Sequence, residues 1–265
     1  MKVKMLMDEE RHKVDPEELK KVILDSGLEL TSKRADVALV VGGDGIFSKY
    51  GRSEPEPVLF VGVRSNRATG SKAYMAETYF DELPAALLRL KGGDYRVKEH
   101  PRLEVFKNRK SLGEVFTDVY LQRGEESTSL RYRVRVSGPS REIEEFAIGD
   151  GVVVTTAAGS AGYYSYPDRI RGNTLDTEAH SKIGEDEIGI CHLIPTYEHR
   201  SGSDERLLRY TVPWGSKIEL WVSRPADARL YGADTGRGGI KVTTKDRIVV
   251  TAGKSSTKVV KLAER

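Results

Sequence analysis

Cysteine is almost absent from this sequence of 265 residues, and its one occurrence is Cys191. A single cysteine excludes an internal disulfide and is typical of proteins in a reducing compartment. No apolar run approaches the roughly 18 residues that a membrane-spanning helix needs, and the first residues turn acidic where a secretory signal would be apolar. We therefore expect a cytoplasmic protein without a membrane partner.

Amide side chains are also scarce. Such thermolabile residues thin out in proteins of hot-living organisms, while lysine, arginine and glutamate increase. The scarcity predicts a thermophilic source. The complete set of amide residues is Asn66, Asn108, Asn173 and Gln122.

Neither sign of charge is in large excess. Charged residues make up 31% of the chain and hydrophobic residues 38%, as in soluble globular proteins, and the formal net charge is only +3. The run LRYRVRV at residues 130–136 alternates arginine with apolar residues, which predicts a half-exposed strand rather than a basic patch. Nucleic acid is therefore not an expected partner.

Candidate metal ligands are few. Cys191, His192 and His199 could bind a metal ion, but no second close pair completes a tetrahedral site. We expect these residues in structural or surface roles and predict no metal site built from protein side chains.

The first 95 residues alternate between buried-strand and amphipathic-helix patterns, which is typical of an open, mostly parallel sheet. One helix start is marked by Asp15, a preferred N-cap residue, and by the proline that follows it. We predict an α/β domain over residues 1–95. Its expected strands cover residues 2–7, 35–41 and 57–63, and its expected helices begin at Pro16 and cover residues 81–90.

From residue 96 to residue 252 the pattern changes to short alternating strands without an amphipathic helix between them. This predicts a β-rich, sandwich-like second domain. Residues 253–265 are expected to return to the first domain. The stretch 168–186 is polar and lacks periodicity, which predicts a long loop.

A first glycine cluster ends one of the buried strands, in VALVVGGDGIF at residues 37–47. Glycine lets the backbone approach a ligand closely, and successive N–H groups in such a turn can form an anion site. The carboxylate of Asp44 would lie within this turn. A simple turn capped by Asp44 is the alternative.

A second cluster, IGDGVVVTTAAGSAGYYSYP, covers residues 148–167. Its carboxylate, Asp150, lies between two glycines and suits ribose hydroxyls, while tyrosines after a small-residue turn suit a flat base. A hairpin with core tyrosines explains the same pattern.

Together these stretches resemble the NAD kinase family, which shares a Gly-Gly-Asp-Gly loop with diacylglycerol kinases and phosphofructokinases. ADVALVVGGDG resembles the family's catalytic strand and loop, and KGGDYRVKEHPRLEV its crossover into the β domain. FTDVYLQRG stands where the family has Asn-Glu-Val followed by Arg-Gly. DGVVVTTAAGSAGYYS stands where it has an Asp-Gly strand and a Thr-Pro-Thr-Gly-Ser-Thr-Ala-Tyr run. This second stretch separates NAD kinases from the other Gly-Gly-Asp-Gly kinases.

The resemblance implies ATP-dependent phosphorylation of NAD at the adenosine ribose 2′-hydroxyl to give NADP. Asp44 would be the general base on that hydroxyl, and the backbone of Gly42, Gly43 and Gly45 would hold phosphates of ATP, with Mg²⁺ on the donor. The expected partners are NAD and ATP, and a homo-oligomer is expected as in the family. The implied NAD-binding residues are Thr117, Asp118, Asp150, Thr156, Ser160 and Tyr163.

The acceptor region departs from the family more than the glycine loop does. Thr117 and Asp118 replace the Asn-Glu pair, and two hydroxyls are lost from the small-residue turn, where Ala158 and Ala161 replace threonines. Two alternatives therefore stay open: a kinase of the same fold acting on another hydroxyl, and a dinucleotide-binding protein without turnover. Polyphosphate as donor and NADH as acceptor also stay open.

The scarcity of amides gives a first testable prediction. The protein should remain folded well above the roughly 45–65 °C at which mesophilic domains melt. Calorimetry measures this directly, and a melting temperature inside that range would remove the thermophile inference.

Overall fold

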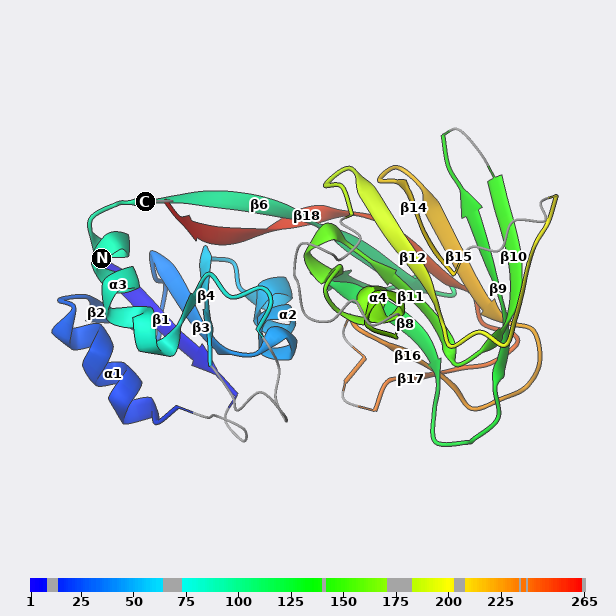
Figure 1. Cartoon of the computed structure of the whole chain (residues 1–265), viewed down its shortest axis with the longest axis horizontal. Helices are drawn as coiled ribbons and strands as arrows, with labels where there is room; N and C mark the ends of the chain where they lie inside the picture. The colour runs from blue at the N-terminus through cyan, green and yellow to red at the C-terminus, as the bar shows by residue number, and fades with distance from the viewer. Residues whose placement is uncertain are drawn as a thin grey trace. The chain divides into compact units, whose positions relative to one another are not determined.

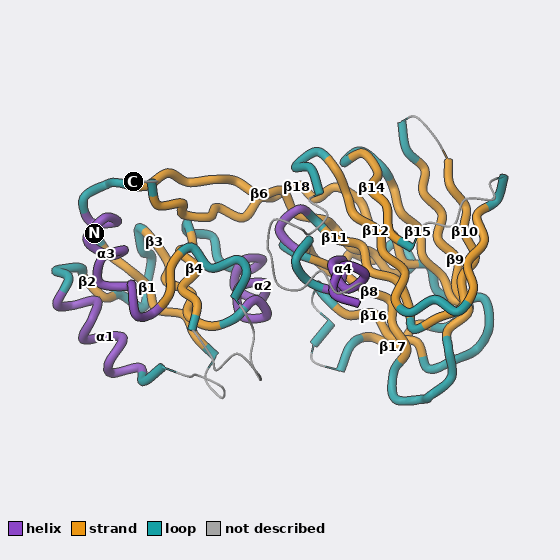
Figure 2. Tube along the Cα trace, viewed as in Figure 1, coloured by secondary structure: helices purple, strands orange, loops and turns teal. Residues whose placement is uncertain are grey.

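The computed structural model describes residues 1–8, 14–63, 73–139, 142–170, 183–202, 208–233, 235–236 and 238–263. The chain divides into two compact units. Unit 1 contains residues 1–100 and 256–265, and unit 2 contains residues 101–255. Two long strands, β6 (Tyr95–Lys107) and β18 (Ile248–Leu262), have residues in both units. Figures 1 and 2 show the elements of each unit.

Unit 1 is built on a parallel sheet with strand order β4-β3-β1-β2, where β5 and the end of β18 also pair with β4 in parallel. The central strand β3 is covered on both faces, because all of its side chains up to Val41 are buried. Such continuous burial explains why the strand is a run of valine and leucine without alternation. The strands are β1 (Lys2–Met7), β2 (Glu29–Leu30), β3 (Val37–Gly42), β4 (Val58–Gly62) and β5 (Thr78–Tyr79).

Within the described residues of unit 1, three α-helices accompany this sheet. The first begins as predicted: the carboxylate of Asp15 accepts a hydrogen bond from the Glu17 N–H, 2.9 Å away, and Pro16 occupies the first helical position. Leu19 and Ile23 of this helix are buried against the sheet. The helices are α1 (Pro16–Asp25), α2 (Asp44–Ser53) and α3 (Leu83–Lys91), the last preceded by the 3₁₀ turn η1 (Phe80–Glu82).

Unit 2 is a sandwich of two antiparallel sheets. One has the order β13-β10-β9-β15-β18, and the hairpin of β6 and β7 (Lys110–Val115) joins it at β18. The other has the order β14-β12-β11-β8-β16-β17. The first sheet includes β9 (Leu130–Ser137), β10 (Glu142–Gly149), β13 (Tyr197–Arg200) and β15 (Lys217–Val222). The second has β8 (Asp118–Arg123), β11 (Gly151–Thr155), β12 (Glu187–Leu193), β14 (Arg209–Pro213), β16 (Ala228–Tyr231) and β17 (Ile240–Val242).

The alternation predicted for residues 130–136 decides which side chains enter the core of unit 2. Tyr132, Val134 and Val136 are buried, while the intervening arginines are partly or fully exposed. Inward side chains of both sheets form one apolar cluster. The predicted fold class, an α/β domain with a mostly parallel sheet plus a β sandwich, is confirmed. In the part of the chain that the structure describes, no helix is both long and apolar enough to cross a membrane.

A charged network is buried within this sandwich. The carboxylate of Glu145 accepts hydrogen bonds from Arg200 Nη2 at 2.7 Å and Tyr210 Oη at 2.5 Å, and it lies 3.3 Å from His192 Nε2. The other ring nitrogen of His192 lies 2.9 Å from Tyr132 Oη. Burial acts to raise the pKa of Glu145, but the hydrogen bonds and charges of its partners outweigh it and lower the pKa. The network therefore holds an ionised carboxylate inside the domain.

Glu145→Gln should destabilise the protein by about 3–5 kcal/mol, because it removes the carboxylate that pairs with the buried Arg200 at 2.7 Å. Glu144→Gln is the matched control, since Glu144 is the adjacent residue on the outer face and its arginine pairs are partly exposed. The control should change stability by about 1 kcal/mol or less.

The pH dependence has a defined sign. A lowered pKa stabilises the fold above the unfolded value of about 4.3 and the gain is lost as pH falls through the folded pKa. Urea unfolding at pH 7 and pH 4 should therefore show the Glu145→Gln penalty shrinking toward acid. If Glu145→Gln and the control Glu144→Gln were equally stable at pH 7, the buried charge pair would be contradicted.

Candidate functional site

The first glycine cluster joins the end of β3 to the start of α2. Gly43 is the N-cap residue of α2, and no side chain caps the helix there. In the strand order β4-β3-β1-β2, the chain leaves β1 toward one side of the sheet and β3 toward the other, so β1 and β3 flank a topological switch point. Ligands of open α/β sheets bind at the carboxyl ends of strands at such a point. The N-terminus of a helix suits a phosphate, because its backbone N–H groups and the helix dipole favour an anion.

Asp44 is the first residue of α2 and is partly exposed. One of its carboxylate oxygens, Oδ1, accepts a hydrogen bond from the Met75 N–H at 3.0 Å. Glycine suits position 42, where φ is +157° and a Cβ would lie only 3.1 Å from the Cβ of Ile46. The helix continues to Ser53 and ends before Pro55, and it contains the buried Gly51. The loop therefore presents a carboxylate at a helix N-terminus.

The second candidate region lies on the outer face of the β8–β11–β12 sheet in unit 2. A segment of short helical turns covers this face: η2 (Ala157–Gly159), η3 (Tyr163–Ser165) and α4 (Tyr166–Ile170). Beneath it lies a small apolar cluster that includes Val153, Tyr164 and Cys191. Residues 171–182 of the predicted loop 168–186 lie outside the described residues.

Polar contacts anchor this covering segment to the sheet. Arg209 of β14 donates to both oxygens of Asp168 at 2.8 Å and to the Tyr164 carbonyl at 3.0 Å. The Tyr166 hydroxyl donates to the His192 carbonyl at 2.8 Å. These contacts fix the segment on the sheet, where its Gly162 lies beside Asp118 at the start of β8.

Thr117 and Asp118 stand at this start of β8. The Thr117 hydroxyl donates to Asp118 Oδ1 at 3.3 Å. Burial raises the pKa of Asp118 to about 6, against the weaker lowering effect of the Thr117 hydroxyl. A Cβ on Gly162 would lie 3.2 Å from the other carboxylate oxygen, so the small residue leaves room for the acid. A carboxyl group whose pKa is shifted by burial is a candidate functional residue.

Two further predicted residues belong to the turn after β11. Thr156 is buried, and its hydroxyl donates to the Phe116 carbonyl at 2.7 Å. Its N–H donates to the Thr117 carbonyl at 2.8 Å. Ser160 follows η2 and is partly exposed. The structure therefore shows Thr156 bracing the backbone that carries Asp118.

Asp150 lies at the far end of this strand pair. In the antiparallel register, Thr155 is opposite Asp118 and Gly151 is opposite Gln122, so β11 separates Asp150 from Asp118 by about 17 Å. Asp150 pairs instead with Arg123, 3.1 Å away. The structure thus brings Thr117, Asp118 and Tyr163 together and places Asp150 elsewhere.

Sequence reasoning missed two tyrosines beside Tyr163. Tyr120 packs edge-on against Tyr163 at a ring distance of 5.2 Å, and it stacks on Tyr231 at 5.2 Å. The period-2 rule could have found Tyr120, because it follows Asp118 by two residues and so shares its face of β8. Tyr231 could not have been found locally, since it reaches Tyr120 only through the pairing of β16 with β8.

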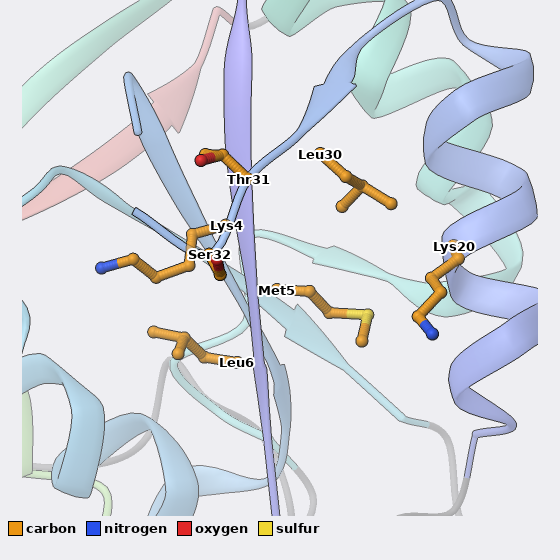
Figure 3. Close-up of a pocket in the computed structure, with 7 residues that line it drawn as sticks. All are labelled: Lys4, Met5, Leu6, Lys20, Leu30, Thr31 and Ser32. Carbon is orange, nitrogen blue, oxygen red and sulfur yellow. The ribbon is translucent and has the colours of Figure 1, made fainter. Parts of the chain in front are cut away.

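A hollow of about 400 Å³ lies in unit 1, and none of the predicted site residues lines it. Figure 3 shows its lining from β1, α1, β2 and the stretch after β2. Its Lys4 pairs with Glu54 and Glu56, and its Lys20 pairs with Glu17. Among the described residues, no group of three or more histidine, cysteine, aspartate or glutamate side chains could hold a metal ion.

Comparison with solved structures identifies the architecture. The structure of yeast NADH kinase complexed with NADH covers 100% of this chain and 84% of its own, with a TM-score of 0.72 and 15% identity. An NAD kinase from Archaeoglobus fulgidus in complex with ATP covers 99% of this chain and 94% of its own, with a TM-score of 0.66 and 15% identity. The chain has the NAD kinase fold.

Curated relatives agree with this fold. An NAD kinase of Saccharolobus islandicus is 32% identical over 149 residues, which are 56% of this chain and 54% of the relative. NAD kinase 1 of Halalkalibacterium halodurans is 29% identical over 158 residues, which are 56% of this chain and 55% of the relative. The chain spans about half the length of the curated relatives it matches. No protein-family model matches it. The resemblance to NAD kinases is confirmed in sequence and fold.

Asp118→Asn should raise the melting temperature at pH 8. The unfolded pKa of aspartate is about 3.9, so a folded value of about 6 means that ionising Asp118 costs stability as pH rises between the two. Asparagine removes this cost, and the gain should shrink at pH 5 and vanish near pH 4. Asp150→Asn is the control, because Asp150 is paired with Arg123 and should gain nothing. A pH-independent effect of Asp118→Asn would refute the shifted pKa.

Proposed function

We propose that this protein is a kinase that transfers the γ-phosphoryl group of ATP to the 2′-hydroxyl of the adenosine ribose of NAD, forming NADP. The observation that carries the proposal is the Gly42–Gly45 turn, which presents Asp44 and an uncapped helix N-terminus at the switch point of a parallel sheet. The NAD kinase fold and the curated NAD kinase relatives support it.

Unit 1 supplies the donor side of this chemistry. The N–H groups at the start of α2 and the backbone of Gly42, Gly43 and Gly45 bind phosphate oxygens, helped by the positive end of the helix dipole. Asp44 accepts the proton of the attacking hydroxyl, and its backbone contact with Met75 fixes the direction of the carboxylate. Phosphoryl transfer needs little beyond such positioning and charge neutralisation.

Magnesium is the metal that this chemistry requires. Mg²⁺ is usually held by one or two carboxylates and by substrate phosphates rather than by an all-protein cage. Once bound, it would neutralise the charge of the transferred group.

Unit 2 supplies the acceptor side. Thr117, Asp118 and Tyr163 contact the adenosine of NAD, and Ser160 lies on the same covering segment. Thr156 acts through the backbone that it braces. Asp150 serves a separate part of the acceptor or a partner chain, given its place at the far end of β11. We further propose a cytoplasmic homo-oligomer from a thermophilic source.

Asp44→Asn should lower NADP formation by roughly 10²–10⁴-fold, because the amide cannot accept the proton. The melting temperature should change little, since the amide oxygen can still accept from Met75. Initial rates are measured with NAD, ATP and Mg²⁺, and parallel arms with polyphosphate and NADH identify the donor and acceptor.

Asp36→Asn is the matched control for this variant. Asp36 lies in the same unit, just before β3, and also accepts one backbone N–H, from Lys2 at 2.7 Å. It should retain full turnover. A stable Asp44→Asn protein with near-wild-type turnover would defeat the catalytic assignment, and no NADP from the wild type would defeat the proposed substrate.

A further inference from the structure

Three tyrosines gather on the outer face of the second sheet of unit 2. Tyr120 lies opposite Tyr231 in the pairing of β8 with β16, and their rings stack with 20° between planes. Tyr163, from the covering segment, meets Tyr120 edge-on at 74° and is 46% exposed. We call Tyr120, Tyr163 and Tyr231 the tyrosine platform.

The platform adjoins the acid of the candidate acceptor site. Asp118 precedes Tyr120 by two residues on the same face of β8, and Gly162 next to Tyr163 lies against the Asp118 carboxylate. Burial raises the pKa of Tyr120 to about 12, and the charge of Asp118 adds to this effect. The rings and the carboxyl group are therefore neighbours on one face of β8.

The hydroxyl groups of the platform set it apart from other tyrosines of unit 2. The hydroxyls of Tyr132 and Tyr210 donate to buried acceptors at 2.6 Å and 2.5 Å. Among the described residues, none forms a hydrogen bond with the hydroxyls of the platform. Tyr132 and Tyr210 are buried, whereas Tyr163 is exposed and Tyr120 and Tyr231 are partly exposed. The platform is therefore not explained as a set of hydrogen-bonded core residues.

The small-residue turn after β11 lacks side-chain hydroxyl groups at two positions. Ala158 and Ala161 carry no hydroxyl, and the Thr117 hydroxyl is directed to Asp118. The turn therefore offers no hydroxyl at these two positions that could distinguish one base from another. Aromatic surface remains, and stacking accepts any base because every base has a π-face.

We propose that Tyr120 and Tyr231, with Tyr163, form a stacking subsite for the acceptor's base and make selection among purine bases weak. The proposal rests on the proposed function, because it takes the acceptor to be a purine dinucleotide. Hypoxanthine and guanine analogues of NAD should then bind within about tenfold of NAD itself. A site that reads adenine by hydrogen bonds would reject them far more strongly.

The test measures binding in the absence of ATP, by titration calorimetry with NAD and its hypoxanthine analogue. Tyr120→Leu and Tyr231→Leu should each weaken binding of both ligands by about tenfold or more, the effect of losing one stacking surface. Tyr120→Phe keeps the ring and should bind within about threefold of wild type. Tyr197→Leu is the matched control, because Tyr197 is 45% exposed and lies on the other sheet of unit 2.

Melting temperatures of all variants show whether they fold, and the phenylalanine variant keeps the test valid if a leucine variant does not. Unchanged binding by the folded leucine variants would overturn the subsite, as would a loss of affinity for the hypoxanthine analogue of more than about a hundredfold. NADP formation is assayed separately. If the wild type forms NADP but the leucine variants bind as tightly as the wild type, the stacking subsite alone is wrong. If the leucine variants bind more weakly but the wild type forms no NADP, the proposed function alone is wrong. A wild type that binds neither dinucleotide would overturn both.

Discussion

The antiparallel pairing of β8 with β11 is the constraint on which the candidate acceptor region depends. It places the Thr117 carbonyl where both the Thr155 hydroxyl and the Thr156 N–H can donate to it, at 3.1 Å and 2.8 Å. The turn that follows β11 then passes the start of β8, where Gly159 lies against the Thr117 carbonyl and Gly162 against the Asp118 carboxylate. Asp118, Tyr120 and the covering segment meet because of this register. A slip of one residue would turn Asp118 into the core and remove the site.

The elements of unit 1 could be predicted because their causes are local. A run of buried valine and leucine residues marks β3, and Asp15 with Pro16 marks the start of α1. The sandwich could be predicted as a class, since alternation along β9 states which side chains are buried. Strand partners could not, because pairing of β16 with β8 joins residues more than a hundred positions apart. Tyr231 was missed for this reason.

The charged network around Glu145 is a second feature that no local sequence pattern could have predicted. Alternation along β10 places Glu145 on the inward face, where a carboxylate alone would be costly. Its partners come from three other strands, so the compensation is invisible in any local pattern. The separation of Asp150 from Asp118 is likewise a matter of register, because a short strand between two motifs carries them to opposite ends.

The return of the chain to unit 1 also has a consequence for how the protein is made. Residues 256–265 complete the first unit: Val259 pairs with Val58, Val260 joins its core, and the Thr257 hydroxyl donates to the Gly51 carbonyl of α2 at 2.6 Å. Unit 2 is contiguous in the chain, whereas unit 1 is formed by residues on both sides of it. The helix that carries Asp44, although among the first segments to leave the ribosome, must wait for residues made more than two hundred positions later before its last support is in place.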